Sequence, residues 1–72
     1  MTRRQASYGE AADMLAELST AVRVTRRARR LDLRQTAEKS GVSFTTIGRI
    51  ERGEDCSLSN AIKLLRWLDG TS

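Results

Sequence analysis

Apolar residues recur every three or four positions in four stretches of the chain, residues 10–30, 32–40, 43–52 and 57–68. This spacing places them along one face of an α-helix. The chain has no proline, and its many charged and small residues favour helix. We therefore expect a compact all-α fold of four helices, built as one domain over residues 10–69.

The two middle stretches carry their own start and stop signals. Asp32 is a favourable helix N-cap, and Gln35 follows three residues later, at the spacing of a capping box. Gly41 supplies the left-handed residue that ends many helices. Ser43 caps the next helix, and Gly53 ends it. The pattern predicts two short helices in quick succession.

The segment between these two helices is short and apolar. Val42 alone separates the glycine stop from the serine start, so we expect this corner to be buried. Ile47 and Ile50 lie three residues apart and form the inner face of the second helix. A helix, a tight glycine turn and a second helix form a helix-turn-helix unit, here residues 32–53.

These residues also resemble a known family. Residues 37–53, AEKSGVSFTTIGRIERG, are similar to the core signature of the Xre/Cro/C1-type (lambda repressor-like) helix-turn-helix domain of phage repressors and many bacterial regulators. The resemblance extends more loosely over residues 18–69. It implies a four-helix domain whose second motif helix enters the major groove of DNA. The family's first helix would begin near Leu18, so residues 10–17 would extend it.

The resemblance further implies which residues contact bases. The family's base-contacting positions fall on Phe44, Thr45 and Arg49, with Ser43 nearby and Thr46 on the same outward face. Arg49 suits guanine O6 and N7, with a salt bridge or a phosphate contact as its alternative. Phe44 would contact a thymine methyl or pack into the corner between the helices. The hydroxyl groups suit bases, phosphates or helix capping.

Phosphate contacts are expected around the second motif helix. The candidates are Arg34, Gln35, Arg52, Ser57 and Asn60. Helix N-termini bind phosphate through free N–H groups and the helix dipole. Many relatives carry a DNA-clamping glutamine where this chain has Leu33, which cannot make that contact. Gly48 is costly inside a helix, and a close approach of DNA or of a neighbouring helix would account for it.

The first stretch predicts one long helix, although Ser19 and Thr20 would also suit a break and a second N-cap. Its apolar stripe runs through Ala11, Leu15, Leu18, Val22 and Thr25, widened by Met14, Ala21, Val24 and Ala28. Acidic residues fall early and five arginines fall late, at positions 23, 26, 27, 29 and 30. This order complements the helix dipole. Because the dipole needs fewer arginines, we expect some of them to contact phosphate.

The last helix is expected to begin after Ser57 and to end near Leu68. Its predicted buried stripe consists of Leu58, Ala61, Ile62, Leu65 and Leu68. Leu64 and Trp67 would project beside that stripe. Trp67 is interpreted either as a core residue or as the anchor of a dimer interface, where aromatic residues are enriched.

Residues 1–9 are polar, carry Arg3 and Arg4, and show no helical period. One interpretation is a flexible, frayed terminus. The other is a basic arm that becomes ordered along DNA, as in several members of the family.

The net charge of +4 and the sequence pI near 10.2 suit a polyanionic partner, either nucleic acid or an acidic membrane surface. Cys56 is the only cysteine and histidine is absent, which leaves no disulfide framework and no ordinary zinc site. Cys56 lies in an acidic turn that raises a thiol pKa, so we interpret it as a polar turn residue. No long apolar run or signal peptide is evident, which favours the cytoplasm of a bacterial host. We expect no cofactor, no metal and no enzymatic activity.

Together these patterns favour a sequence-specific regulator that binds double-stranded DNA as a homodimer. It would act as a phage-type repressor that covers a promoter. The alternative is an antitoxin that binds both operator DNA and a toxin, with the first helix and Trp67 as the toxin surface. A protein-interaction module that uses the fold without DNA is a third hypothesis, against which the density of arginines argues.

Overall fold

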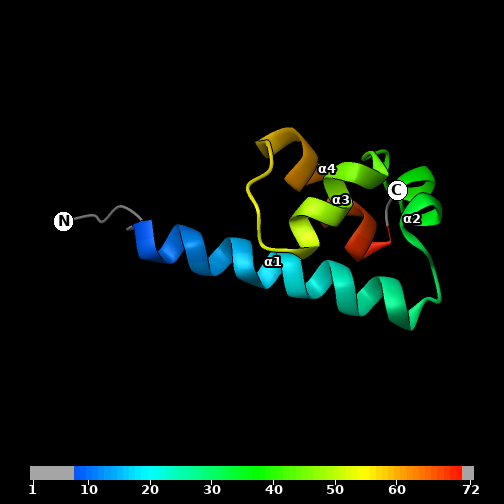
Figure 1. Ribbon diagram of the computed structural model, residues 1–72, viewed down its shortest axis with the longest axis horizontal. Coiled ribbons are helices and arrows are strands. Elements are labelled where there is room, and N and C mark those ends of the chain that lie inside the picture. The colour runs from blue at the N-terminus through cyan, green and yellow to red at the C-terminus, as the bar shows by residue number, and fades with distance from the viewer. Residues whose placement is uncertain (1–7, 71–72) are drawn as a thin grey trace.

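The computed structural model describes residues 8–70, and these form four helices and no strand (Figure 1). The helices are α1 (Tyr8–Ala28), α2 (Leu33–Ser40), α3 (Phe44–Glu51) and α4 (Leu58–Asp69). This confirms the predicted all-α, four-helix fold. Within these described residues, no helix is both long enough and apolar enough to cross a membrane.

α1 is one continuous helix, which confirms the favoured reading of the first stretch. It begins at Tyr8, two residues earlier than expected, and ends at Ala28 rather than at Arg30. Ser19 does not break it, because the Ser19 hydroxyl donates to the backbone oxygen of Glu51 at 3.1 Å. A buried hydroxyl that bonds across to another helix has no need to cap a new one.

The C-terminal end of α1 is capped without a glycine. Arg30 adopts a left-handed conformation with φ of 59°. The N–H of Leu31 bonds to the carbonyl of Arg26 at 2.9 Å, and the N–H of Arg30 bonds to that of Arg27 at 3.0 Å. These two bonds form a Schellman motif, whose left-handed position is usually glycine. The absence of that glycine explains why the helix end was placed too late.

The helix-turn-helix unit is capped as predicted. The Asp32 carboxylate accepts from the N–H of Gln35 at 2.7 Å, and the Gln35 side chain accepts from the N–H of Asp32 at 2.9 Å. Gly41 ends α2 in the left-handed conformation with φ of 81°. Ser43 opens α3 by accepting from the N–H of Thr46 at 3.2 Å. These local signals fix both ends of the turn.

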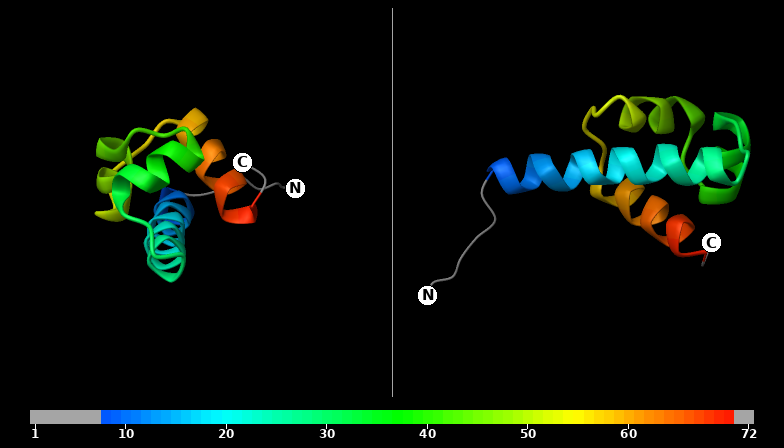
Figure 2. Two further views of the ribbon diagram at one scale, coloured as in Figure 1. Left: turned by 90° about the vertical axis from the view of Figure 1, so that its right-hand side faces the viewer. Right: turned by 90° about the horizontal axis from the view of Figure 1, so that it is seen from below.

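The helices surround one small core. α1 packs against α3 and α4, and α2 packs against the same two helices. The buried apolar residues are Val22, Val42, Ile47, Ile50, Leu64 and Trp67. The burial of Val42 confirms the apolar corner. Two views show the N-terminal half of α1 extending beyond the other three helices (Figures 1 and 2).

α4 buries a different face from the one predicted. Leu58, Ile62 and Leu65 are 77%, 40% and 53% exposed, whereas Leu64 and Trp67 are buried. The predicted stripe was wrong for Leu58, Ile62 and Leu65, because it followed the aliphatic residues and left the larger indole beside them. Leu68 does pack against the core as predicted, and Ala61 is half-buried. Burying the indole removes more apolar surface from water than burying one aliphatic side chain, so the helix turns Trp67 inward.

Trp67 is therefore a core residue, and its proposed role as an interface anchor is wrong. Arg29, the residue after α1, lies over its ring, 4.9 Å from the centroid. The same guanidinium donates to the backbone oxygens of Trp67 and Leu68 at 3.1 and 3.2 Å. These bonds place a positive charge at the negative end of the α4 dipole.

The apolar stripe of α1 is also narrower than predicted. Leu18 and Val22 pack into the core, but Met14 and Val24 are 66% and 57% exposed, and Ala28 is exposed as well. α3 and α4 cover only one side of α1, so three of the four residues expected to widen the stripe face solvent, while Ala21 is half-buried.

The register of α4 can be tested with two neighbouring leucines. Leu64→Ala should lower the free energy of unfolding by about 2–5 kcal/mol, because it leaves a cavity in the core. Leu65→Ala, on the exposed face, should change it by no more than about 0.5 kcal/mol. Urea denaturation of both variants provides the measurement. A larger loss for Leu65→Ala would restore the register predicted from the sequence.

Candidate nucleic-acid interface

The N-terminus of α3 presents hydroxyl groups that take part in its own cap. Ser43 accepts from the N–H of Thr46 at 3.2 Å, and its hydroxyl also bonds to that of Thr46 at 2.8 Å. Thr45 is exposed between them. Capping therefore occupies Ser43 and Thr46 in the unbound protein, and Thr45 has the more accessible hydroxyl.

Arg49 lies on the outward side of α3. Ile47 and Ile50 turn inward and are fully buried, while Arg49 is exposed. Among the described side chains, none bonds to its guanidinium. All five of its N–H donors are thus available to a partner, which suits a bidentate contact with guanine or phosphate.

Phe44 does not pack into the core. Its side chain is 40% exposed at the start of α3, and the guanidinium of Arg34 lies over its ring, 4.4 Å from the centroid. The stack joins the start of α2 to the start of α3. Phe44 is therefore not a core residue, but its stack on Arg34 lies at the corner between the two motif helices, and the two residues form one exposed unit.

Gly48 is not required by the packing of the helices. A Cβ at this position would lie 3.7 Å from Cδ1 of Leu33 and 3.5 Å from Nη1 of Arg52, which are ordinary contact distances. The neighbouring helix could therefore accept alanine. The sequence suggests that either a neighbouring helix or DNA approaches Gly48 closely. The packing does not require the first, and the second stays a prediction.

The expected phosphate ligands differ in the protein contacts that their polar groups already make. Gln35 uses its side-chain oxygen in the capping box. Arg52 forms an exposed ion pair with Glu54 at 3.1 Å. Ser57 caps α4 by accepting from the N–H of Asn60 at 3.1 Å. Each group lies at a helix end, and Arg3 and Arg4 lie outside the described residues.

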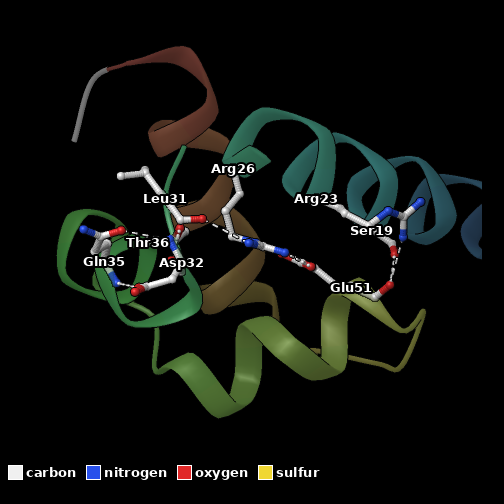
Figure 3. Close-up of polar contacts among 8 residues, drawn as sticks. All are labelled: Ser19, Arg23, Arg26, Leu31, Asp32, Gln35, Thr36 and Glu51. Carbon is white, nitrogen blue, oxygen red and sulfur yellow. Dashed lines mark hydrogen bonds and ion pairs between the residues drawn. The ribbon is translucent and has the colours of Figure 1, made fainter. Parts of the chain in front are cut away.

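Glu51, the last residue of α3, is held to α1 by three side chains (Figure 3). Arg26 binds its carboxylate through Nε and Nη2, at 2.6 and 2.9 Å. Ser19 Oγ and Arg23 Nη1 donate to its backbone oxygen at 3.1 and 3.2 Å. We call Ser19, Arg23, Arg26 and Glu51 the α1–α3 clamp. It brings positive charge to the negative end of the α3 dipole.

The ion pair of the clamp is largely shielded from solvent. The Arg26 and Glu51 side chains are 15% and 11% exposed. Their hydrogen bond is the main cause that raises the pKa of Arg26 above its ordinary value, so the guanidinium stays charged. Arg26 also donates to the backbone oxygen of Leu31 at 3.0 Å, beside the cap of α2. One side chain thus joins α1 to α3 and to the connection that leads into α2.

Most of the arginine-rich end of α1 therefore serves the fold. Arg23 and Arg26 belong to the clamp, and Arg29 holds the end of α4. The expected phosphate contacts of this tail now rest on Arg27 and Arg30, which are exposed.

Sequence reasoning missed the role of Glu51. The residue follows Ile47 by four positions and Ile50 by one, which places it near the buried face of α3. A carboxylate there needs a charged partner, because an unpaired buried charge is costly. An acid at this spacing, together with the surplus of arginines in the first helix, is the signal that would have found the clamp.

Cys56 is half-buried and packs against the core, so its interpretation as a polar turn residue was wrong. Burial raises the pKa of its thiol, and the nearby charge of Asp55 raises that pKa further. The raised pKa agrees with the sequence and makes the thiol a weak nucleophile at neutral pH. Over the described residues, no group of three His, Cys, Asp or Glu side chains could hold a metal ion.

The contribution of the clamp to stability can be compared with that of the exposed ion pair between Arg52 and Glu54. Glu51→Gln should lower the free energy of unfolding by about 1.5–3 kcal/mol, because Arg26 loses a charged acceptor in a shielded site. Glu54→Gln removes the exposed partner of Arg52 and should cost about 0–1 kcal/mol. Equal losses in urea denaturation would show that burial does not strengthen the Arg26–Glu51 pair.

Comparison with known proteins agrees with this geometry. A family model described as helix-turn-helix matches residues 22–71, which contain the whole motif and α4. No curated protein and no solved structure matches the chain. The part of α1 before Val22 lies outside the matched region. The chain belongs to the Xre/Cro/C1-type helix-turn-helix family, a family of DNA-binding transcription regulators.

Proposed function

We propose that this protein recognises a specific sequence in double-stranded DNA and represses transcription by covering a promoter, as a phage-type repressor does. The observation that carries the proposal is the exposed face of α3, where the guanidinium of Arg49 has no partner among the described side chains. An α-helix fits the major groove, and arginine makes the commonest specific contact with guanine there.

The way α3 is held supports specific reading. Ser43 caps its N-terminus and the α1–α3 clamp holds its C-terminus. Ile47 and Ile50 fix its inner face. A helix held at both ends and along one face needs no reordering of its backbone on binding, so binding energy is lost only to ordering its exposed side chains.

Phosphate contacts would surround this face. Helix N-termini offer free N–H groups, and α2 and α4 both begin near exposed polar residues, Gln35 and Ser57. Arg52 can exchange its exposed pairing with Glu54 for a phosphate, because such surface pairs are weak. Affinity should therefore fall with salt, with a log–log slope of about −0.9 per phosphate neutralised.

We further propose that two copies bind a two-fold site, with half-sites roughly 34 Å apart. A two-fold interface uses the same patch on both copies, and Trp67 is too buried to provide it. The exposed stripe of α4, formed by Leu58, Ile62 and Leu65, is an apolar patch suited to this role. Its residues lie at helical spacing, so two such stripes can pack face to face.

The antitoxin hypothesis keeps one supporting observation. The N-terminal half of α1 extends beyond the other helices and offers a surface for a protein partner (Figure 2). The second half of the expected toxin surface, Trp67, lies in the core. Stable co-purification with the product of a neighbouring gene, through a surface lost on deletion of residues 1–17, would favour the antitoxin over the repressor.

Selection of bound DNA from a random pool tests the proposed function. The wild-type chain should enrich a short two-fold motif, and Arg49→Ala should relax its preference at one guanine by roughly 1–3 kcal/mol. Arg27→Ala removes an exposed arginine of α1 and serves as the matched control. That control should weaken binding to all sequences alike. Enrichment of no motif at any salt concentration would refute sequence-specific binding.

The α4 stripe is tested by the oligomeric state. Leu65→Gln replaces an exposed apolar residue without changing the charge and should weaken dimerisation about tenfold or more. Ser59→Gln, an exposed polar position of the same helix, should leave it unchanged. Sedimentation equilibrium with and without operator DNA measures both variants. A dimer that is unaffected by Leu65→Gln would place the interface elsewhere.

A further inference from the structure

Arg34 and Phe44 form a preassembled pair at the outer corner of the helix-turn-helix unit. Arg34 is the second residue of α2, Phe44 is the first residue of α3, and the guanidinium lies 4.4 Å from the ring centroid. Both residues are exposed. The pair therefore joins the entrances of the two motif helices on the surface that would face DNA.

Stacking leaves the hydrogen-bonding edge of Arg34 unused. A cation–π contact engages the face of the guanidinium, while its N–H donors point outward in the plane of the group. Among the described side chains, no acceptor bonds to Arg34. Arg23, Arg26 and Arg29, by contrast, bond to protein groups. Arg34 can thus present an intact fork to a ligand.

A hollow lies beside the pair, and its other charged groups are already engaged by the protein. The hollow, of about 400 Å³, is lined by Arg26, Asp32, Leu33, Arg34 and Phe44. The Arg26 side chain bonds to Glu51 and to Leu31, and the Asp32 carboxylate accepts from Gln35 in the cap of α2. What remains for a ligand is the apolar surface of Leu33 and Phe44 beside one guanidinium with free donors.

This combination matches two neighbouring base edges in the major groove. Thymine presents a methyl group, for which an apolar wall is suited, and guanine presents O6 and N7, which accept from an arginine fork. Bases along a strand are stacked about 3.4 Å apart, and the guanidinium is likewise stacked over the ring, with its Cζ 4.4 Å from the centroid. A stacked pair of side chains can therefore face a stacked pair of bases.

We propose that Arg34 and Phe44 read a thymine–guanine step together, with Leu33 and Phe44 against the thymine methyl and Arg34 on the adjacent guanine. The sequence predicts that Arg34 contacts phosphate. In this proposal Arg34 instead contacts a base and determines specificity. Phe44 has two functions, since its ring contacts the methyl and also positions Arg34. This inference rests on the proposed sequence-specific binding of DNA.

The test combines selection from a random DNA pool with affinities for the selected site. Arg34→Ala should reduce discrimination at the guanine beside a thymine by roughly 5- to 150-fold. Replacing that thymine with deoxyuridine removes only the methyl group and should weaken wild-type binding about fourfold. Phe44→Leu keeps an apolar contact but removes the aromatic platform. It should lose preference for the guanine more than for the thymine.

Arg27→Ala is the matched control, because it removes one exposed arginine away from the pair. If Arg34→Ala instead weakens all sequences equally and reduces the salt slope by about one unit, Arg34 is a phosphate contact and the proposal is overturned. Equal affinity for thymine and deoxyuridine would also overturn it. These outcomes differ from failure of the proposed function, in which the wild-type chain selects no motif at all.

Discussion

The bidentate bond between Arg26 and Glu51 is the interaction on which the placement of α3 depends. α3 has eight residues, fewer than an isolated helix needs to be stable in water. Its direction is therefore set from outside, by the contacts of α1 at its C-terminal end and by the burial of Ile47 and Ile50 along its inner face. A rotation of α3 about its axis would exchange Arg49 for buried isoleucines on the outer face. The same contact that stabilises the fold thus decides which side chains α3 exposes.

The motif could be predicted because its signals are local. Asp32, Gly41 and Ser43 act on residues within four positions of themselves, and each adopts the expected geometry. The register of α4 could not be predicted in the same way. Whether Leu64 or Leu65 is buried depends on the space left by α1 and α2, and no pattern within α4 predicts that space. Periodicity identified the helix, and tertiary packing selected its face.

The candidate site likewise has features that the sequence predicts and others that depend on tertiary contacts. Family resemblance indicated the outward positions of α3, and the exposure of Thr45 and Arg49 agrees with it. The stack of Arg34 on Phe44 joins residues ten positions apart across the turn. No periodicity within either helix predicts this contact, because it depends on how the turn places the two helices. The clamp at Glu51 required still more distant partners. Contacts between helices assign these side chains their roles, because a sequence pattern specifies the face of a helix but not its neighbour.

The one-sided anchoring of α1 has a consequence for how that helix forms. In the described part of the chain, the hydrogen bonds that tie α1 to the other helices come from its C-terminal half and from Arg29 just after it, from Ser19 onward. Starting a helix is unfavourable, whereas adding residues to an existing one is nearly neutral. The docked half therefore serves as the nucleus on which residues 8–17 propagate as helix. The length of the free part then follows the local balance of propagation and fraying, and it can change without disturbing the DNA-reading unit.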